Sequence, residues 1–143
     1  MQKNIVIILL KLFAQKAKNT VALGVKALKW DPFGSAHMTI SNEQMEKSVN
    51  IVGAVREAVG DKVDLLIECH GRFNPTTAVL ISKELEQFKP MFMEEPCIPD
   101  NIDSTAYVRK HSNIPIAAGE RGYGKCAFQE MFEKNAVDYA QPD

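Results

Sequence analysis

The sequence lacks several features that would assign a protein of this size to a common class. It has no CxxC cysteine pair, no basic run with interleaved aromatic residues, and no glycine-rich loop of the kind that holds phosphates. The formal net charge of the 143 residues is −1, so we expect neither a nucleic-acid partner nor an anionic membrane surface. An apolar run at residues 5–13 is interrupted by Lys11 and is too short to span a bilayer. The composition, with 45% hydrophobic residues, is instead that of a soluble globular domain with a sizeable core.

The cysteines are few and scattered. Cys69, Cys97 and Cys126 are odd in number, which favours reduced thiols over a disulfide framework. We therefore expect a cytoplasmic protein in which these residues act as small hydrophobic side chains.

Short apolar segments alternate with segments of helical pattern along the whole sequence. Strands are predicted at residues 25–30, 63–67, 91–93, 114–118 and 137–140. Ser41, followed by Gln44, is predicted to cap one intervening helix, and Asn74 followed by Pro75 is predicted to start the next. Strands that alternate with helices predict an α/β protein with a parallel sheet and helices outside it. Five strands are too few to close a standard eight-stranded barrel.

An acidic residue follows each predicted strand, and three of these residues recur at a constant interval. Glu68, Glu94 and Glu120 lie 26 residues apart (68 to 94, 94 to 120), close to the length of one βα unit, of which a complete βαβ motif needs roughly 30 residues or more. The carboxyl ends of parallel strands meet at one edge, where α/β proteins bind ligands. Like charges gathered there need a cation, and oxygen ligands suit Mg²⁺, with Mn²⁺ as its substitute. The spacing therefore predicts a magnesium site made by these three glutamates.

Other polar residues stand beside the predicted ligands. Adjacent strand residues face opposite ways, so only one of Glu94 and Glu95 can point into the site, and the interval selects Glu94. His70 stands two residues after Glu68 and would share its face if the strand geometry persists, as a proton donor or acceptor. Arg72 can bind a substrate carboxylate through two hydrogen bonds.

Lys29 and Asp31 share one face of the first predicted strand. Three roles stay open for Lys29: a base if its pKa is lowered, an anchor for a substrate carboxylate, or a partner of Glu68. Asp31 is assigned to substrate binding.

Six segments, in order, carry a resemblance to a known family. They are ALKWDPFG, AVREAVG, LLIECHGRFNP, FMEEP, IPIAAGER and VDYAQPD, within residues 13–143. The chain resembles the barrel domain of the enolase superfamily, in its mandelate racemase-like branch, and most closely sugar-acid dehydratases of the galactonate and gluconate type. The resemblance implies a partial (β/α)8 TIM-type barrel, as a single domain over residues 1–143. It would hold about strands 2 to 6, without the capping domain and strands 7 and 8.

The resemblance also implies roles for individual residues. It makes Glu68, Glu94 and Glu120 the Mg²⁺ ligands, although the first ligand in these dehydratases is typically an aspartate. His70 matches the histidine that acts as general acid on the leaving hydroxyl.

The remaining matches concern the base. Lys29 matches the first lysine of the family's KxK motif, whereas Asp31 stands where the second lysine would be. Asp143 matches the aspartate that orients a histidine on the seventh strand, which we expect to lie outside this chain.

The implied reaction is removal of the proton alpha to a carboxylate, through an enediolate, with loss of the β-hydroxyl. We expect the parent protein to be a Mg²⁺-dependent hydro-lyase of a small sugar acid, and the isolated chain to be inactive or weakly active. Two alternatives remain: a non-catalytic, flavodoxin-like α/β binding module, and a scaffold fragment that self-associates to cover its open strand edges. We also expect a homo-oligomer.

Overall fold

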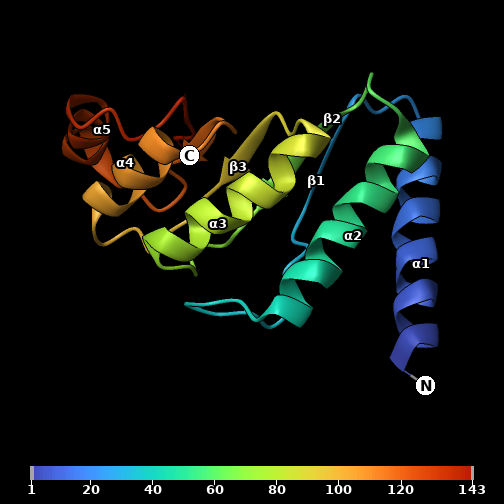
Figure 1. Ribbon diagram of the computed structural model, residues 1–143. Helices are drawn as coiled ribbons and strands as arrows, with labels where there is room; N and C mark the ends of the chain where they lie inside the picture. The colour runs from blue at the N-terminus through green and yellow to red at the C-terminus, as the bar shows by residue number, and fades with distance from the viewer. Residues whose placement is uncertain (1, 143) are drawn as a thin grey trace.

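The computed structural model describes residues 2–142, with side chains from residue 7 onward. Helices and strands alternate as α1 (Gln2–Ala22), β1 (Ala27–Trp30), α2 (Asn42–Val59), β2 (Asp64–Glu68), α3 (Pro75–Leu85), β3 (Phe92–Glu94), α4 (Ile102–His111), β4 (Ile116–Ala118), α5 (Gly124–Glu133) and β5 (Tyr139–Ala140). A short 3-10 helix, η1 (Glu86–Phe88), continues α3 (Figure 1). None of the helices described is both long enough and apolar enough to cross a membrane.

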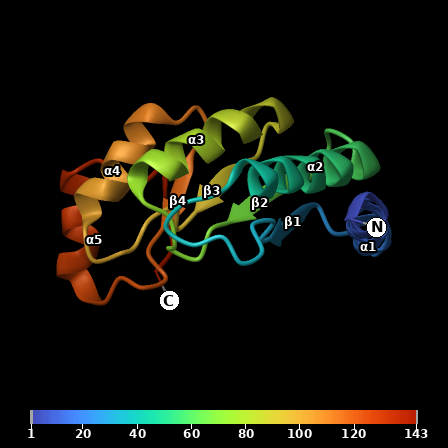
Figure 2. The ribbon, with the colours of Figure 1, turned by 60° about the horizontal axis from the view of Figure 1, so that its bottom comes forward.

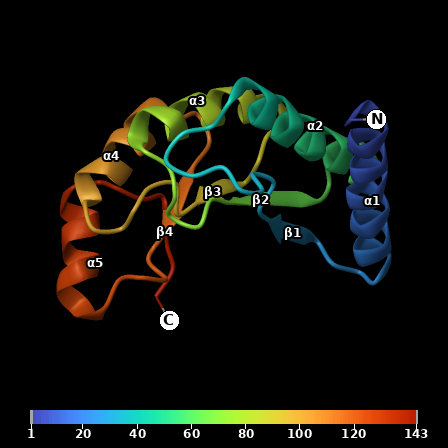
Figure 3. The ribbon, with the colours of Figure 1, turned by 90° about the horizontal axis from the view of Figure 1, so that it is seen from below.

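The five strands form one open parallel sheet in sequence order, β1-β2-β3-β4-β5. The sheet curves into an arc, with the strands on the inside and α2, α3 and α4 along the outside (Figure 3). Helices α1 and α5 lie at opposite ends of this arc (Figures 2 and 3). The α/β class, the five parallel strands and the incomplete barrel are confirmed.

The sheet order excludes one alternative. A flavodoxin-like sheet has the order 2-1-3-4-5, with a reversal beside its first strand. The described strands follow one another without a reversal, so the flavodoxin-like topology of that alternative is wrong.

Local sequence signals set the starts of three helices. Ser41 accepts a hydrogen bond from the Gln44 amide, and the Gln44 side chain accepts one from the Ser41 amide, which completes the predicted capping box of α2. Asn74 accepts from the Thr77 amide at 2.8 Å ahead of Pro75, as expected for α3. Asn101 caps α4 by accepting from the Asp103 amide, two residues on.

Every strand begins one or two residues later than predicted, while its end falls at or within one residue of the predicted end. For example, β2 spans Asp64–Glu68 where 63–67 was predicted, and β4 spans Ile116–Ala118 where 114–118 was predicted. Apolar patterning reports burial, whereas a strand begins where hydrogen bonding to a neighbour begins, and only the neighbour fixes that point.

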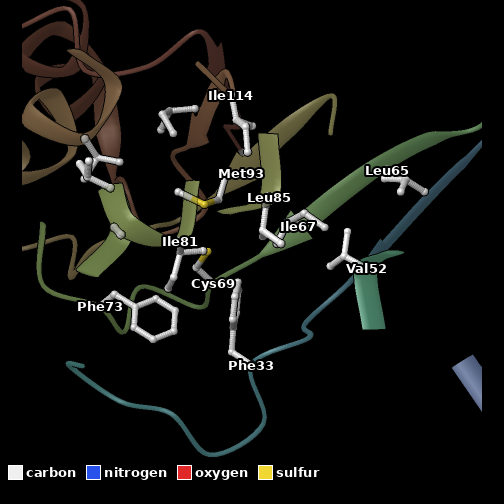
Figure 4. Packing of buried hydrophobic residues seen from close by; sticks show 14 of the residues in the cluster. Phe33, Val52, Leu65, Ile67, Cys69, Phe73, Ile81, Leu85, Met93 and Ile114 are labelled. Carbon is white, nitrogen blue, oxygen red and sulfur yellow. The ribbon is translucent and has the colours of Figure 1, made fainter. Parts of the chain in front are cut away.

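The core lies between the sheet and the outer helices (Figure 4). Leu65, Ile67 and Met93 project from β2 and β3 toward the outer helices, which contribute Val52 of α2 and Ile81 and Leu85 of α3; all six are fully buried. Burial of each such side chain contributes about 1.5–3 kcal/mol.

An aromatic pair closes the core below the carboxyl ends of the strands. Phe33 and Phe73 meet edge to face, with ring centroids 5.1 Å apart. Both follow strand ends, so this contact joins the loop after β1 to the loop after β2.

One arginine of α2 ties together the opposite, amino-terminal edge of the sheet. The Arg56 guanidinium donates to the carbonyl oxygens of Gly60 and Val63, just before β2, at 2.9 and 2.7 Å. It also donates to those of Phe88 and Lys89, just before β3, at 2.9 and 3.2 Å. A planar fork with five donors can serve four carbonyls at once, which an ammonium cannot.

We predict that Arg56→Lys lowers the free energy of unfolding by about 2 kcal/mol, because several carbonyls lose a charged donor. Urea denaturation measures the loss. Lys62→Ala, in the neighbouring exposed turn, is the control and should change stability by less than about 0.5 kcal/mol. Equal stability of the Arg56 variant and the control would contradict this role.

The three thiols differ in exposure. Cys69 and Cys97 are buried, whereas Cys126 is exposed on α5. Burial raises the pKa of the Cys97 thiol to about 12 and raises the pKa of Cys69 well above its ordinary value. A thiol must be both reachable and ionised to react.

We therefore predict that a disulfide reagent such as DTNB labels one thiol per folded chain and three after unfolding. Absorbance of the released thiolate gives the count. Cys126→Ser should abolish the labelling of the folded chain, and rapid labelling of that variant would show that Cys69 or Cys97 is accessible.

Candidate active site

Two glutamates and one lysine meet at the carboxyl ends of β1, β2 and β3. Lys29 Nζ lies 2.7 Å from Glu94 Oε1 and 3.5 Å from Glu68 Oε2. The register of β2 with β3 sets Glu68 directly beside Glu94. Both glutamates are buried, Glu94 with only 1% of its side chain exposed, and Lys29 is 45% exposed. The ammonium thus supplies the positive charge that two neighbouring carboxylates require.

Lys29 is not poised to act as a base in this arrangement. The hydrogen bond to Glu94 raises the pKa of Lys29, and the charge of Glu68 acts in the same direction. A lysine base needs the opposite shift. Of the three roles that the sequence left open for Lys29, the structure displays ion pairing, with Glu94 as the nearer partner.

Glu94 carries an unsatisfied oxygen. Its Oε2 is buried and has no hydrogen-bond partner within the part of the chain that the structure describes. Buried polar atoms are nearly always paired, so an unpaired carboxylate oxygen indicates a missing partner. Glu68 differs, because its Oε1 accepts the His70 amide at 2.8 Å, and burial raises the pKa of its carboxyl group.

Glu120 lies just after β4 but does not join the other two glutamates. Its carboxylate is 38% exposed and contacts Arg121 Nε at 3.4 Å. Within residues 2–142, no three His, Cys, Asp or Glu side chains are gathered closely enough to hold a metal ion. The structure brings two of the three predicted ligands together, and a site that uses all three stays a prediction.

His70 reaches the site by a backbone turn and not by continued strand geometry. β2 ends at Glu68, and His70 adopts a positive φ of 55°. Its imidazole Nδ1 lies 2.8 Å from Asp31 Oδ2, at the end of β1. A carboxylate only accepts hydrogen bonds, so Nδ1 carries a proton and Nε2 faces away from Asp31.

Asp31 is also bound by Arg72. Arg72 Nη2 lies 2.8 and 2.6 Å from the two Asp31 oxygens, and Asp31 Oδ1 accepts the Phe33 amide at 2.8 Å. The other Arg72 donors reach the carbonyls of Cys69 and Gly34. The two predicted substrate-binding residues are therefore bonded to each other, and their contact with a substrate stays a prediction. Asp143 lies outside the described residues, and its predicted role also stays a prediction.

Sequence reasoning missed the part played by Glu95. Glu95 is only 3% exposed, and its Oε1 accepts the Gly119 amide at 2.9 Å. Burial raises the pKa of this carboxyl group. The signal was present in the doublet Glu94-Glu95, because an acidic residue inside an apolar segment must find a partner once it is buried.

Comparison with known proteins places this chain in a family. The Enolase C-terminal domain-like family matches residues 12–143. D-gluconate dehydratase of Thermoproteus tenax is 44% identical over 131 residues, covering 92% of this chain and 26% of that protein. D-gluconate/D-galactonate dehydratase of Picrophilus torridus is 37% identical over 131 residues, covering 92% of this chain and 34% of that protein.

Solved structures agree with the sequence comparison. A mandelate racemase/muconate lactonizing enzyme-like protein from Rubrobacter xylanophilus DSM 9941 superposes with a TM-score of 0.85 at 38% identity, covering 91% of this chain and 35% of that one. A member of the enolase superfamily from Salmonella Typhimurium gives 0.87 at 28% identity, with coverages of 92% and 36%. The chain spans about a quarter to a third of the length of the curated relatives named above. The resemblance seen in the motifs is confirmed: this chain belongs to the Enolase C-terminal domain-like family, in the mandelate racemase-like branch of the enolase superfamily.

Proposed function

We propose that the chain is part of a Mg²⁺-dependent dehydratase that removes water from a sugar acid of the gluconate or galactonate type. Its relatives named as D-gluconate and D-galactonate dehydratases support this chemistry. The observation that carries the proposal is the pair of buried glutamates at adjacent strand ends, one with an unpartnered oxygen.

The residues present fit a magnesium ion. Glu68, Glu94 and Glu120 offer only oxygen, the donor that Mg²⁺ prefers, and Glu94 Oε2 still lacks a partner. Glu120 would have to turn from Arg121, and such an exposed ion pair is worth at most about 1 kcal/mol. When bound, the ion would offset the negative charge that develops on a substrate carboxylate as its neighbouring proton is removed.

His70 is proposed as the group that gives a proton to the departing hydroxyl. Asp31 holds the ring through Nδ1 and leaves Nε2 for the substrate. Arg72 in turn fixes Asp31 by binding both of its oxygens. The side chain of His70 is 52% exposed, so a substrate can reach it.

Lys29 keeps a second task in this proposal. Its half-exposed ammonium neutralises Glu68 and Glu94, and a metal ion held by these glutamates would make that pairing unnecessary. Once released, the ammonium can attract the carboxylate of a sugar acid, the anchoring role that the sequence left open.

The metal site predicts a magnesium-dependent melting temperature. Mg²⁺ at 100 times its dissociation constant should stabilise the folded chain by about 2.7 kcal/mol. Glu94→Gln should lose most of that shift, because a neutral amide is a weaker ligand. Glu57→Gln, exposed on α2, is the matched control. A shift of the same size in the Glu94 variant and the control would contradict the site.

We predict weak or no turnover by the 143-residue chain, because it spans only about a quarter to a third of its dehydratase relatives. The assay supplies D-gluconate or D-galactonate with Mg²⁺ and measures the 2-keto-3-deoxy product. A full-length relative serves as the positive control. Rapid product formation by the isolated chain would show that the remaining length is dispensable.

A further inference from the structure

We infer that Glu95 is a positioning residue that clamps the loop carrying Glu120. The role given to Glu120 rests on the proposed function, whereas the clamp itself rests on contacts within the chain. Glu95 Oε1 accepts the Gly119 amide at 2.9 Å, and Gly119 immediately precedes Glu120.

The backbone of Glu95 joins three strand ends. Its amide donates to the Ala117 carbonyl of β4 at 2.9 Å, and its own carbonyl accepts the Gly71 amide at 2.7 Å. Gly71 directly follows His70. Through one residue, the loop after β2 and the loop after β4 are therefore held against the end of β3.

Glu95 reaches these partners because its backbone adopts an unusual conformation. Its φ is 45°, in the left-handed region that residues with a side chain rarely occupy. The turn sends consecutive carboxylates to different places, Glu94 to Lys29 and Glu95 to Gly119. Such strain persists only where the surroundings over-determine it, and the three hydrogen bonds of Glu95 do so.

The backbone conformation and the packing of Gly119 both restrict the position of the amide that it donates to Glu95. Its φ of 137° favours glycine, and a Cβ there would lie 2.9 Å from the Phe128 ring and 3.0 Å from the backbone of Gln141. With packing on one side and a carboxylate on the other, the Gly119 peptide has little freedom. The backbone of Glu120, the next residue, is therefore held in a fixed position.

Charge and geometry both act on Glu95. Its carboxylate lines a small cavity of about 120 Å³ together with the cationic Arg121 and with Thr105. The contact that orders the loop is a hydrogen bond from an amide, which needs an acceptor of the correct reach. Substitutions at Glu95 can therefore separate the effect of side-chain length from the effect of side-chain charge.

The test uses two opposed variants of the 143-residue chain. Glu95→Gln keeps the reach and loses the charge, whereas Glu95→Asp keeps the charge and is one methylene shorter. Thr105→Val, which removes a buried hydroxyl from the same cavity, is the matched control. Amide hydrogen exchange, followed by mass spectrometry, measures the freedom of residues 119–121 without any metal.

We expect Glu95→Asp to speed exchange at residues 119–121 at least tenfold while α2 and α3 stay unchanged. Glu95→Gln and Thr105→Val should stay within about twofold of the parent chain. Faster exchange throughout the chain, an unchanged loop in Glu95→Asp, or a loop released by Glu95→Gln but not by Glu95→Asp would each overturn the clamp.

Calorimetric titration with Mn²⁺ then connects the clamp to the metal. Glu95→Asp should weaken Mn²⁺ binding at least fivefold, and Glu95→Gln should change it less than twofold. If the parent chain binds no Mn²⁺, the metal site of the proposed function is wrong, while the exchange data still decide the clamp. If Mn²⁺ binds all variants equally although the loop is released, the link between the clamp and Glu120 is wrong.

Discussion

The repulsion between two buried carboxylates is the constraint on which the site depends. The register of β2 with β3 places Glu68 directly beside Glu94. Burial of even one unpaired charge costs several kcal/mol, and Glu94 is almost wholly removed from water. Positive charge at this end of the sheet lowers that cost, and the ammonium of Lys29 supplies it in the structure.

At this edge of the sheet, turns of the backbone beyond the strand ends orient side chains that the strands themselves do not orient. His70 and Glu95, each one or two residues past a strand end, adopt left-handed conformations. Each such residue costs about 1–2 kcal/mol. Hydrogen bonds between neighbouring loops offset that cost, among them Gly71 to the Glu95 carbonyl and the His70 amide to Glu68. The strain lies at the edge where the proposed chemistry takes place, as is common at functional sites.

The sequence was informative about the interior of elements and about helix starts, because these depend on local patterns. Ser41 with Gln44 and Asn74 with Pro75 start their helices as predicted. From the constant interval, Glu68 and Glu94 were also expected at one edge of the sheet, and both lie there. It could not show that Glu120 lies against Arg121, since a side-chain direction after the last strand residue depends on the turn that follows.

Contacts between distant loops were beyond the reach of sequence patterns. The pairing of His70 with Asp31 joins residues 39 positions apart, and that of Glu95 with Gly119 joins residues 24 positions apart. Two of the four carbonyls bound by Arg56 are a further case, since Phe88 and Lys89 lie 32 and 33 positions from it in the sequence. Such contacts follow from the folded arrangement of loops, for which periodicity carries no signal.

The order of the sheet has a consequence for how the chain acquires its structure. Each of the strands β2 to β5 pairs with the strand that precedes it in the sequence. Among the five described strands, a segment leaving the ribosome therefore meets a partner that has already been synthesised. Each pairing joins neighbouring βα units, so the arc can grow one unit at a time during translation.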